Sequence, residues 1–158
     1  MPAGPAIDHD ATVTDTTAPS IGAILGIHHV KIPVTDLVRS RDWYEPLFEL
    51  VPLTEFRDDH DGVIRGVSYR SLGNLALALR EHPEAARGLA GYDCFAMMLR
   101  GRADVEHWCE RLDRFGIAHS EIIDVPIGSI LTFADPDGIE LRFYSLDPTG
   151  ADPEGRVR

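Results

Sequence analysis

The clearest pattern of hydrophobic and polar positions lies in the segment that follows the turn Asp-Pro-Asp-Gly near the C-terminal end. Polar Glu140, Arg142 and Tyr144 alternate there with apolar Leu141 and Phe143. Side chains at every second position of a strand share one face, so we expect the apolar pair to point to the core. The polar set then lines a cavity, because unpaired charge inside a packed core costs too much free energy.

The same kind of pattern along the rest of the chain predicts one order of elements twice. Strand alternation, helical spacing, capping residues and Gly/Pro turn signals define the segments. A strand over 26–34, a helix capped by Asp36 and strands over 53–58, 62–71 and 74–80 form the first copy. After a linker over 82–91, a strand over 92–99, a helix over 103–115 and strands over 118–123, 129–134 and 138–145 form the second. Two βαβββ modules predict an α+β fold with a paired architecture.

The ends of the chain carry no periodic apolar pattern. Residues 1–22 are rich in Pro, Ala, Thr and Asp, and residues 147–158 are polar. We expect a disordered N-terminal tail, a single domain over 23–146 and a C-terminal tail. A length of 158 residues suits one domain with a sizeable core.

Composition narrows the classes of partner. The net charge of −11, from 26 acidic and 15 basic residues, disfavours nucleic acid and anionic membrane and mildly favours cationic ligands. No apolar run is long enough to cross a bilayer, and the N-terminus lacks the pattern of a secretory signal, so a cytoplasmic location is expected. Cys94 and Cys109 lie in apolar segments, which favours reduced, buried thiols over a disulfide.

Three motifs carry a resemblance to a known family. They are Ile-His-His-Val-Lys-Ile-Pro-Val-Thr-Asp-Leu at 27–37, Ser-Arg-Asp-Trp-Tyr-Glu-Pro-Leu-Phe at 40–48 and Asp-Pro-Asp-Gly-Ile-Glu-Leu at 135–141. They resemble the vicinal oxygen chelate superfamily, which contains glyoxalase I, extradiol dioxygenases, fosfomycin-modifying enzymes and bleomycin-resistance proteins. The resemblance implies that modules at about 26–81 and 91–146 form a half-open mixed β-barrel, often completed in a homodimer.

The resemblance also implies where a divalent metal would be held. Its usual ligand positions fall on His29, Cys94 and Arg142, and a further position falls on Ala76 or Ala78. Because an arginine cannot deprotonate to bind a cation, a metal-free protein is favoured. The alternative is one Fe, Mn, Ni or Zn ion on an altered ligand set of His29, Cys94 and Glu140.

Without a metal, the expected cup is lined by polar and apolar side chains from both modules: His29, Lys31, Cys94, Ala96, Met98, Glu140, Arg142 and Tyr144, with Ser68, Arg70 and Arg80 in addition. One interpretation is structural, with Glu140 paired to Lys31 or Arg142. The other is catalytic. His29 then acts as general acid or base, Arg142 or Lys31 holds a carboxylate or enolate oxygen, and Tyr144 supplies a hydrogen bond.

Two functions follow from this cup. The first is a small-molecule-binding protein with a degenerate metal site that sequesters a ligand or drug; the acidic chain fits a cationic drug. The alternative is an isomerase, epimerase, lyase or dioxygenase-type enzyme acting on a small oxygenated substrate. We expect His28 to face outward or pack against the helix, and His119 to lie at the surface.

Overall fold

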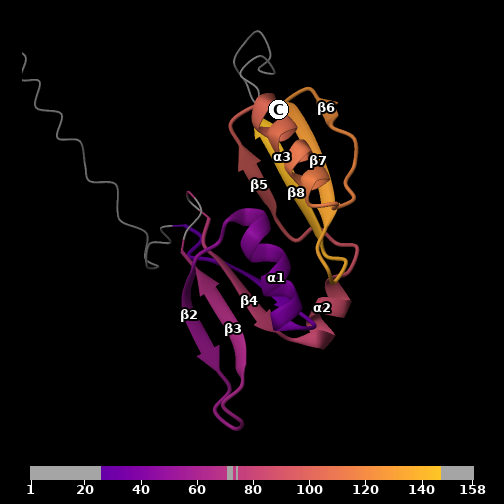
Figure 1. Ribbon diagram of the computed structural model, residues 1–158. Helices are drawn as coiled ribbons and strands as arrows, with labels where there is room; N and C mark the ends of the chain where they lie inside the picture. Colours follow the sequence, from indigo (N-terminus) through magenta and orange to yellow (C-terminus); the bar gives the residue numbers. More distant parts are fainter. Residues whose placement is uncertain (1–25, 71–72, 74, 147–158) are drawn as a thin grey trace, which may run out of the picture.

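The computed structural model describes residues 26–70, 73 and 75–146, so both expected tails lie outside the described residues. The first module contains β1 (Val30–Val34), α1 (Leu37–Phe48), β2 (Pro52–Arg57), β3 (Ile64–Tyr69) and β4 (Leu77–Glu81). After α2 (Pro83–Leu89), the second contains β5 (Ala96–Leu99), α3 (Arg102–Arg114), β6 (Ile123–Val125), β7 (Gly128–Ala134) and β8 (Glu140–Leu146). In Figure 1 the first module, indigo to magenta, lies below the second, orange to yellow.

Each module contributes one four-stranded mixed sheet. The strand orders are β1-β4-β3-β2 and β5-β8-β7-β6, with the parallel pair formed by the first and last strand of each module. The two sheets do not close into a full barrel. The predicted α+β fold of two βαβββ modules in a half-open arrangement is therefore confirmed.

Two predicted segments are wrong in detail. The expected linker over 82–91 contains α2, because His82 accepts a hydrogen bond from the amide of Ala85 and Pro83 starts the helix. The expected strand over 118–123 forms only an isolated bridge between His119 and Phe133, and β6 begins later. Capping by a side chain and pairing across the sheet decide these segments, and neither is visible in local periodicity.

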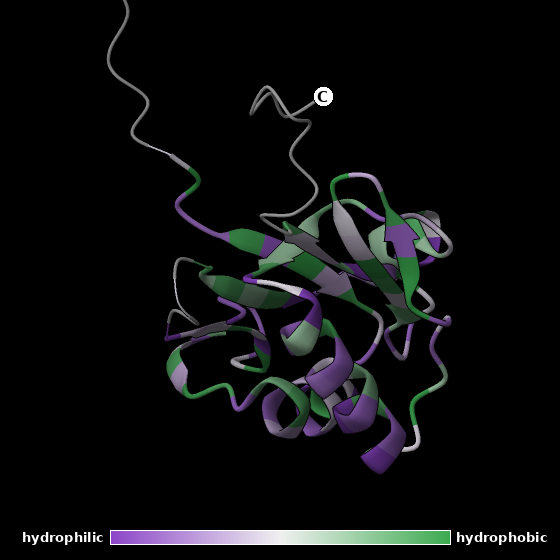
Figure 2. Ribbon diagram, turned by 90° about the horizontal axis from the view of Figure 1, so that it is seen from above, coloured by the Kyte–Doolittle hydropathy of each residue, from purple (hydrophilic) through white to green (hydrophobic). Residues whose placement is uncertain are grey.

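The helices lie on one side of the strands, as Figure 2 shows from above. On that side the sheets bury their apolar residues: in β8 Leu141 and Phe143 are at most 1% exposed, whereas Glu140, Arg142 and Tyr144 lie on the other face and are half-buried. The alternation in β8 therefore has the predicted orientation. No helix in the described ranges is both long and apolar enough for a membrane span.

Aromatic side chains from both modules form one core. Phe48 of α1 packs against Trp108, Phe133 and Phe143 of the second module, with ring centroids 5.3 to 6.5 Å apart. Tyr44 is fully buried beside them. The shared cluster therefore fixes α1 against the second module.

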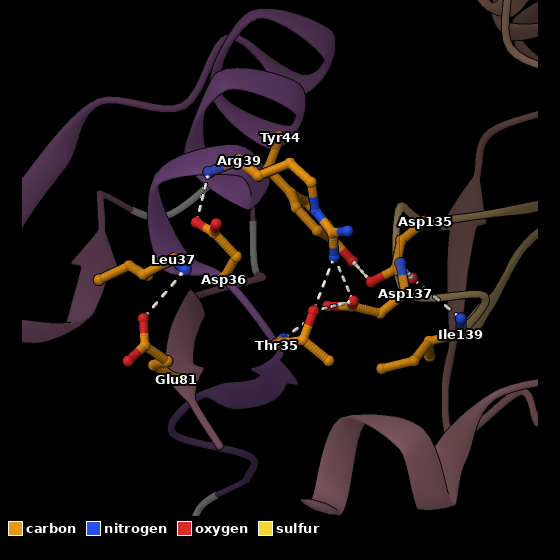
Figure 3. Close-up of polar contacts among 9 residues, drawn as sticks. All are labelled: Thr35, Asp36, Leu37, Arg39, Tyr44, Glu81, Asp135, Asp137 and Ile139. Carbon is orange, nitrogen blue, oxygen red and sulfur yellow. Dashed lines mark hydrogen bonds and ion pairs between the residues drawn. The ribbon is translucent and has the colours of Figure 1, made fainter. Parts of the chain in front are cut away.

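The Asp-Pro-Asp-Gly turn before β8 joins the two modules (Figure 3). Asp137 accepts hydrogen bonds from the amide of Thr35 at 2.8 Å and from its hydroxyl at 2.5 Å, and also pairs with Arg39. Asp135 accepts a hydrogen bond from the Tyr44 hydroxyl at 2.9 Å. The turn therefore holds α1 and the residues just before it, about one hundred residues earlier in the chain.

Asp135 is also fixed within its own turn. Its Oδ1 accepts hydrogen bonds from the amides of Asp137 and Ile139, both at 2.9 Å, while Oδ2 receives the Tyr44 hydroxyl. Burial raises the pKa of Asp135 even though these donors oppose it. A buried carboxylate that accepts three hydrogen bonds has a structural role. Keeping it ionised costs free energy, and these hydrogen bonds, which hold the turn, offset that cost.

Candidate functional site

A hollow of about 660 Å³ lies on the face of the first sheet that carries Lys31, Ser68 and Ala78. Its residues come from β1, β2, β3, β4 and the segments beside them: His28, His29, Lys31, Leu53, Phe56, Gly66, Ser68, Tyr69, Arg70, Ala76, Leu77, Ala78, Leu79 and Arg80. We refer to it as the first-module hollow. Its size suits a small organic molecule.

Small residues form the floor of the first-module hollow. Lys31, Ala78 and Ser68 are register partners across β1, β4 and β3, and therefore share one face. Next to them Arg80 is paired with Gly66, where a Cβ would lie 3.3 Å from Arg80 Cδ. Gly66 thus leaves room for the Arg80 stem to lie across the sheet, and the small floor leaves space above it.

Positive charge gathers around this floor. Lys31, Arg70 and Arg80 line the first-module hollow, and no Asp or Glu of the described residues does so. The carboxylate next in sequence to Arg80, Glu81, is bound instead by Arg65 at 2.7 Å. The local charge is therefore opposite to the net charge of the chain, and it opposes the cationic ligand expected from composition.

Two histidines lie at the edge of the same hollow. His28 Nδ1 and His29 Nδ1 are 2.9 Å apart, and both side chains are exposed. Two ring nitrogens at this distance share one proton, so one donates and the other accepts. His29 lies near Lys31 as expected. His28, expected to face outward or to pack against the helix, is exposed but also lines the hollow, because both histidines precede the regular strand.

The polar side chains of β8 form a separate group on the second sheet. Arg142 pairs with Glu140 on the same strand and with Asp93 Oδ2 at 2.9 Å. The hydrogen bond with Glu140 raises the pKa of Arg142. The predicted Glu140–Arg142 pair is therefore present, and Asp93, which precedes β5, is an additional partner.

The expected cup residues divide between the two sheets. His29, Lys31, Ser68, Arg70 and Arg80 line the first-module hollow. Ala96 and Met98 lie opposite Arg142 and Tyr144 in the β5–β8 pair, and Met98 is 74% exposed. Within the described chain, the residues predicted from the second module contribute nothing to the first-module hollow.

The residues at the usual metal positions do not fit a divalent cation. Arg142 holds a permanent charge at one position, and Ala76 and Ala78 offer no ligand atom at another. In the described part of the chain, the potential ligand atoms of His29, Cys94 and Glu140 do not lie close together. Those of Cys109, Asp113 and His119 do.

The cysteines differ from the expectation of buried thiols. Both are free, but Cys94 is exposed, because it precedes β5 instead of lying inside a strand. Cys109 is partly buried on α3 beside His119. His119, expected at the surface, has a side chain only 14% exposed. The exposure of these side chains depends on the residue at which each strand begins, and hydrophobic periodicity locates the ends of strands least reliably.

Comparison with known proteins gives the family. Residues 26–143 match the model of the Glyoxalase/Bleomycin resistance protein/Dioxygenase superfamily. The chain belongs to this superfamily. This match confirms the family resemblance that the three sequence motifs indicated. A search of curated proteins finds no match.

Solved structures support the fold of this superfamily member. A glyoxylase/bleomycin resistance protein/dioxygenase domain from Frankia sp. EAN1pec is 26% identical with a TM-score of 0.64, over 80% of this chain and 95% of that chain. TnmS3, an antibiotic binding protein from Streptomyces sp. CB03234, is 22% identical (TM-score 0.61; 80% and 100%). The fosfomycin resistance protein FosX from Listeria monocytogenes is 15% identical (TM-score 0.62; 81% and 98%). At the two lower identities the likeness concerns the fold alone.

Proposed function

We propose that the chain binds a small organic anion in the first-module hollow and holds it without a metal. The observation that carries the proposal is that Lys31, Arg70 and Arg80 line this hollow together with small residues, and that no carboxylate of the described residues does. A ligand with an apolar body and one carboxylate, phosphonate or sulfonate group fits this arrangement. Its body covers the floor and its anionic group meets the basic side chains.

Electrostatics favours the anion over a cation of the same size. A unit charge about 4 Å from the ligand contributes about 1 kcal/mol even at the dielectric constant of water, and more where the site excludes water. Lys31 and Arg80 come from adjacent strands, so both cations face one bound group. Each basic residue attracts an anionic ligand and repels a cationic one.

The printed name of one structural relative agrees with a binding role, and that of another concerns resistance to an antibiotic. TnmS3 is described as an antibiotic binding protein, and FosX as a fosfomycin resistance protein. By analogy we propose sequestration of a small molecule as the task of the first-module hollow, with drug-like acids as one class of ligand. The charge of the hollow is what narrows the class to anions.

Isothermal titration calorimetry with three matched probes tests the proposal. Phenylphosphonate, phenylacetamide and benzylammonium share an aromatic body and differ in charge. We expect phenylphosphonate to bind best and benzylammonium to give no saturable heat. Lys31→Met keeps the length of the side chain and should weaken phenylphosphonate about fivefold, which corresponds to about 1 kcal/mol.

Two further variants make the result specific. Ala78→Phe fills the floor of the first-module hollow and should abolish binding while the apolar surface remains. Arg100→Met removes a cation that is 94% exposed in the second module and should leave binding unchanged. Equal affinity for the three probes, or an equal loss in Lys31→Met and Arg100→Met, would contradict an anion site in this hollow.

An enzyme is the second candidate, and the His28–His29 pair favours it. In such a pair the histidine that donates through Nδ1 keeps the lone pair of its Nε2 free, and this Nε2 can remove a proton from a bound acid and return it. The reaction class is proton transfer at the carbon next to a carboxylate or carbonyl, as in an epimerase or isomerase. The expected signal is incorporation of solvent deuterium at that carbon, followed by NMR with a panel of 2-hydroxy and 2-aryl acids.

A matched pair of histidine variants separates catalysis from binding. His29→Gln should stop exchange and leave the acid bound, whereas His60→Gln, in the exposed turn between β2 and β3, should leave both unchanged. Exchange that persists in His29→Gln excludes the catalytic role. Binding with no exchange in the wild type favours sequestration.

We also propose that the protein is a homodimer. The second sheet leaves Met98 74% exposed on the face that carries Arg142 and Tyr144, and β2 leaves Leu53 62% and Phe56 46% exposed beside the first-module hollow. A second copy would cover these apolar groups. It would also bring the second sheet of one subunit toward the first-module hollow of the other subunit.

Light scattering after size exclusion should give twice the mass of 17.4 kDa. Met98→Lys should shift the protein to monomer, and a wild-type monomer would contradict the proposal.

A further inference from the structure

A second cluster of chemically active side chains lies on the second module, apart from the first-module hollow. Cys109 and Asp113 are four residues apart on α3 and therefore share one face of the helix. His119 lies in the segment after α3, with its side chain only 14% exposed. One potential ligand atom from each of the three residues lies within 4.8 Å of the other two.

The backbone around His119 fixes the orientation of its ring. His119 forms an isolated bridge with Phe133 of β7, and the next amide, that of Ser120, donates to Thr132 O at 2.8 Å. His119 Nδ1 lies 2.7 Å from Ser120 O. A carbonyl accepts only, so Nδ1 carries the proton and donates. The lone pair of a neutral ring is then on Nε2, which is the arrangement found in metal-bound histidines.

The distances at Nε2 are close to those around a bound zinc ion. Nε2 is 3.2 Å from Asp113 Oδ1 and 3.8 Å from Cys109 Sγ. With Zn–S of about 2.3 Å and Zn–N or Zn–O of about 2.0 to 2.1 Å, tetrahedral geometry places N and O about 3.3 Å apart and S and N about 3.6 Å apart. Sγ is also 3.9 Å from Nδ1, so binding requires the Cys109 side chain to rotate away from Nδ1, to the side of Nε2.

We propose that Cys109, Asp113 and His119 form a zinc-binding site on the helix side of the second module. Thiolate, imidazole and carboxylate together are a donor set typical of Zn²⁺, and water completes the fourth position because Asp113 is 72% exposed. The ion joins the last turn of α3 to the segment that bridges to β7. The site shares no residue with the altered metal set His29, Cys94 and Glu140.

Cobalt titration of the full chain tests the site, because Co²⁺ replaces Zn²⁺ and reports its ligands in the absorption spectrum. We expect one equivalent of Co²⁺ to bind with a thiolate-to-cobalt charge-transfer band and the visible bands of four-coordinate cobalt, and Zn²⁺ to displace both. Cys109→Ser should remove the charge-transfer band. His119→Gln should weaken Zn²⁺ binding by more than about a hundredfold, since loss of an outer partner alone costs ten- to a hundredfold.

Controls are available on the same module. Cys94→Ser removes the other thiol and His107→Gln removes an exposed imidazole of α3, and both should leave the spectrum and affinity of the wild type. Circular dichroism of each variant verifies folding. A wild-type protein that binds no cobalt, a charge-transfer band that persists in Cys109→Ser, or one that is lost in Cys94→Ser would overturn the proposal.

Discussion

Replacing Tyr44 with Phe removes a single hydroxyl group from the junction between the two modules. That hydroxyl donates to Asp135 Oδ2 at 2.9 Å, with Tyr44 fully buried and Asp135 only 6% exposed. Burial raises the pKa of Tyr44, and the neighbouring Asp135 adds to the effect, so the phenol remains a donor. In the variant, one oxygen of a buried carboxylate loses its side-chain donor and gains no access to water.

The expected cost follows from the charge of the acceptor. A hydrogen bond to a charged group contributes about 1.5 to 3 kcal/mol, so Tyr44→Phe should lower the free energy of unfolding by about 2 kcal/mol. For a domain of this size that corresponds to a fall in Tm of about 4 to 8 °C. Urea unfolding followed by tryptophan fluorescence measures both Cm and m, and m should not change.

Tyr69→Phe is the matched control. The Tyr69 hydroxyl donates to Glu45 Oε1 at 3.2 Å, but Glu45 is 27% exposed and is already bound by Arg41 at 2.7 Å. Its loss should cost about 0.5 to 1 kcal/mol. A Tyr44→Phe variant within about 0.5 kcal/mol of the wild type, or equal losses in the two variants, would refute the role assigned to the junction.

Two further predictions concern the ends of β7 and β8. Burial raises the pKa of Asp137, but hydrogen bonds from the first module outweigh it and hold the pKa below the ordinary value of 3.8. The ionised Asp137 therefore stabilises the fold above pH 3.8, and this stabilisation is lost as the pH falls through the lowered pKa of the folded protein. When Tm is measured as a function of pH, the Tm of Asp137→Asn should be lower than that of the wild type near neutral pH and should fall less in acid. Gly128 has φ +150° and a Cβ there would lie 1.6 Å from Ser145 O, so Gly128→Ala should cost at least about 2 kcal/mol in urea unfolding, whereas Gly88→Ala, with open space around it, should be neutral or slightly stabilising.

Local chemistry was enough to predict most of the elements. Asp36 accepts from the amide of Arg39 and starts α1 where the capping signal placed it. The faces of β8 follow from its alternation alone, since a strand buried on one side must place Leu141 and Phe143 toward the core. Repetition of the βαβββ order then fixed the architecture.

The candidate site was harder to predict because it depends on contacts between distant segments. The Asp-Pro-Asp-Gly turn has a strong local signal, but its partners Thr35 and Tyr44 are about one hundred residues away. The net charge of the chain also averages over the whole surface, whereas the basic side chains Lys31, Arg70 and Arg80 gather on one sheet face. The bridge that positions His119 against β7 was missed for the same reason.

The central claim is that an organic anion binds over the small-residue floor of the first sheet. An NMR titration of the ¹⁵N-labelled protein with phenylphosphonate tests it most directly, because amide shifts locate the ligand. The account predicts saturable shifts concentrated at Lys31, Ser68, Ala78 and Arg80, and none of comparable size with benzylammonium. Shifts concentrated on β5 and β8, or larger shifts with benzylammonium, would contradict it.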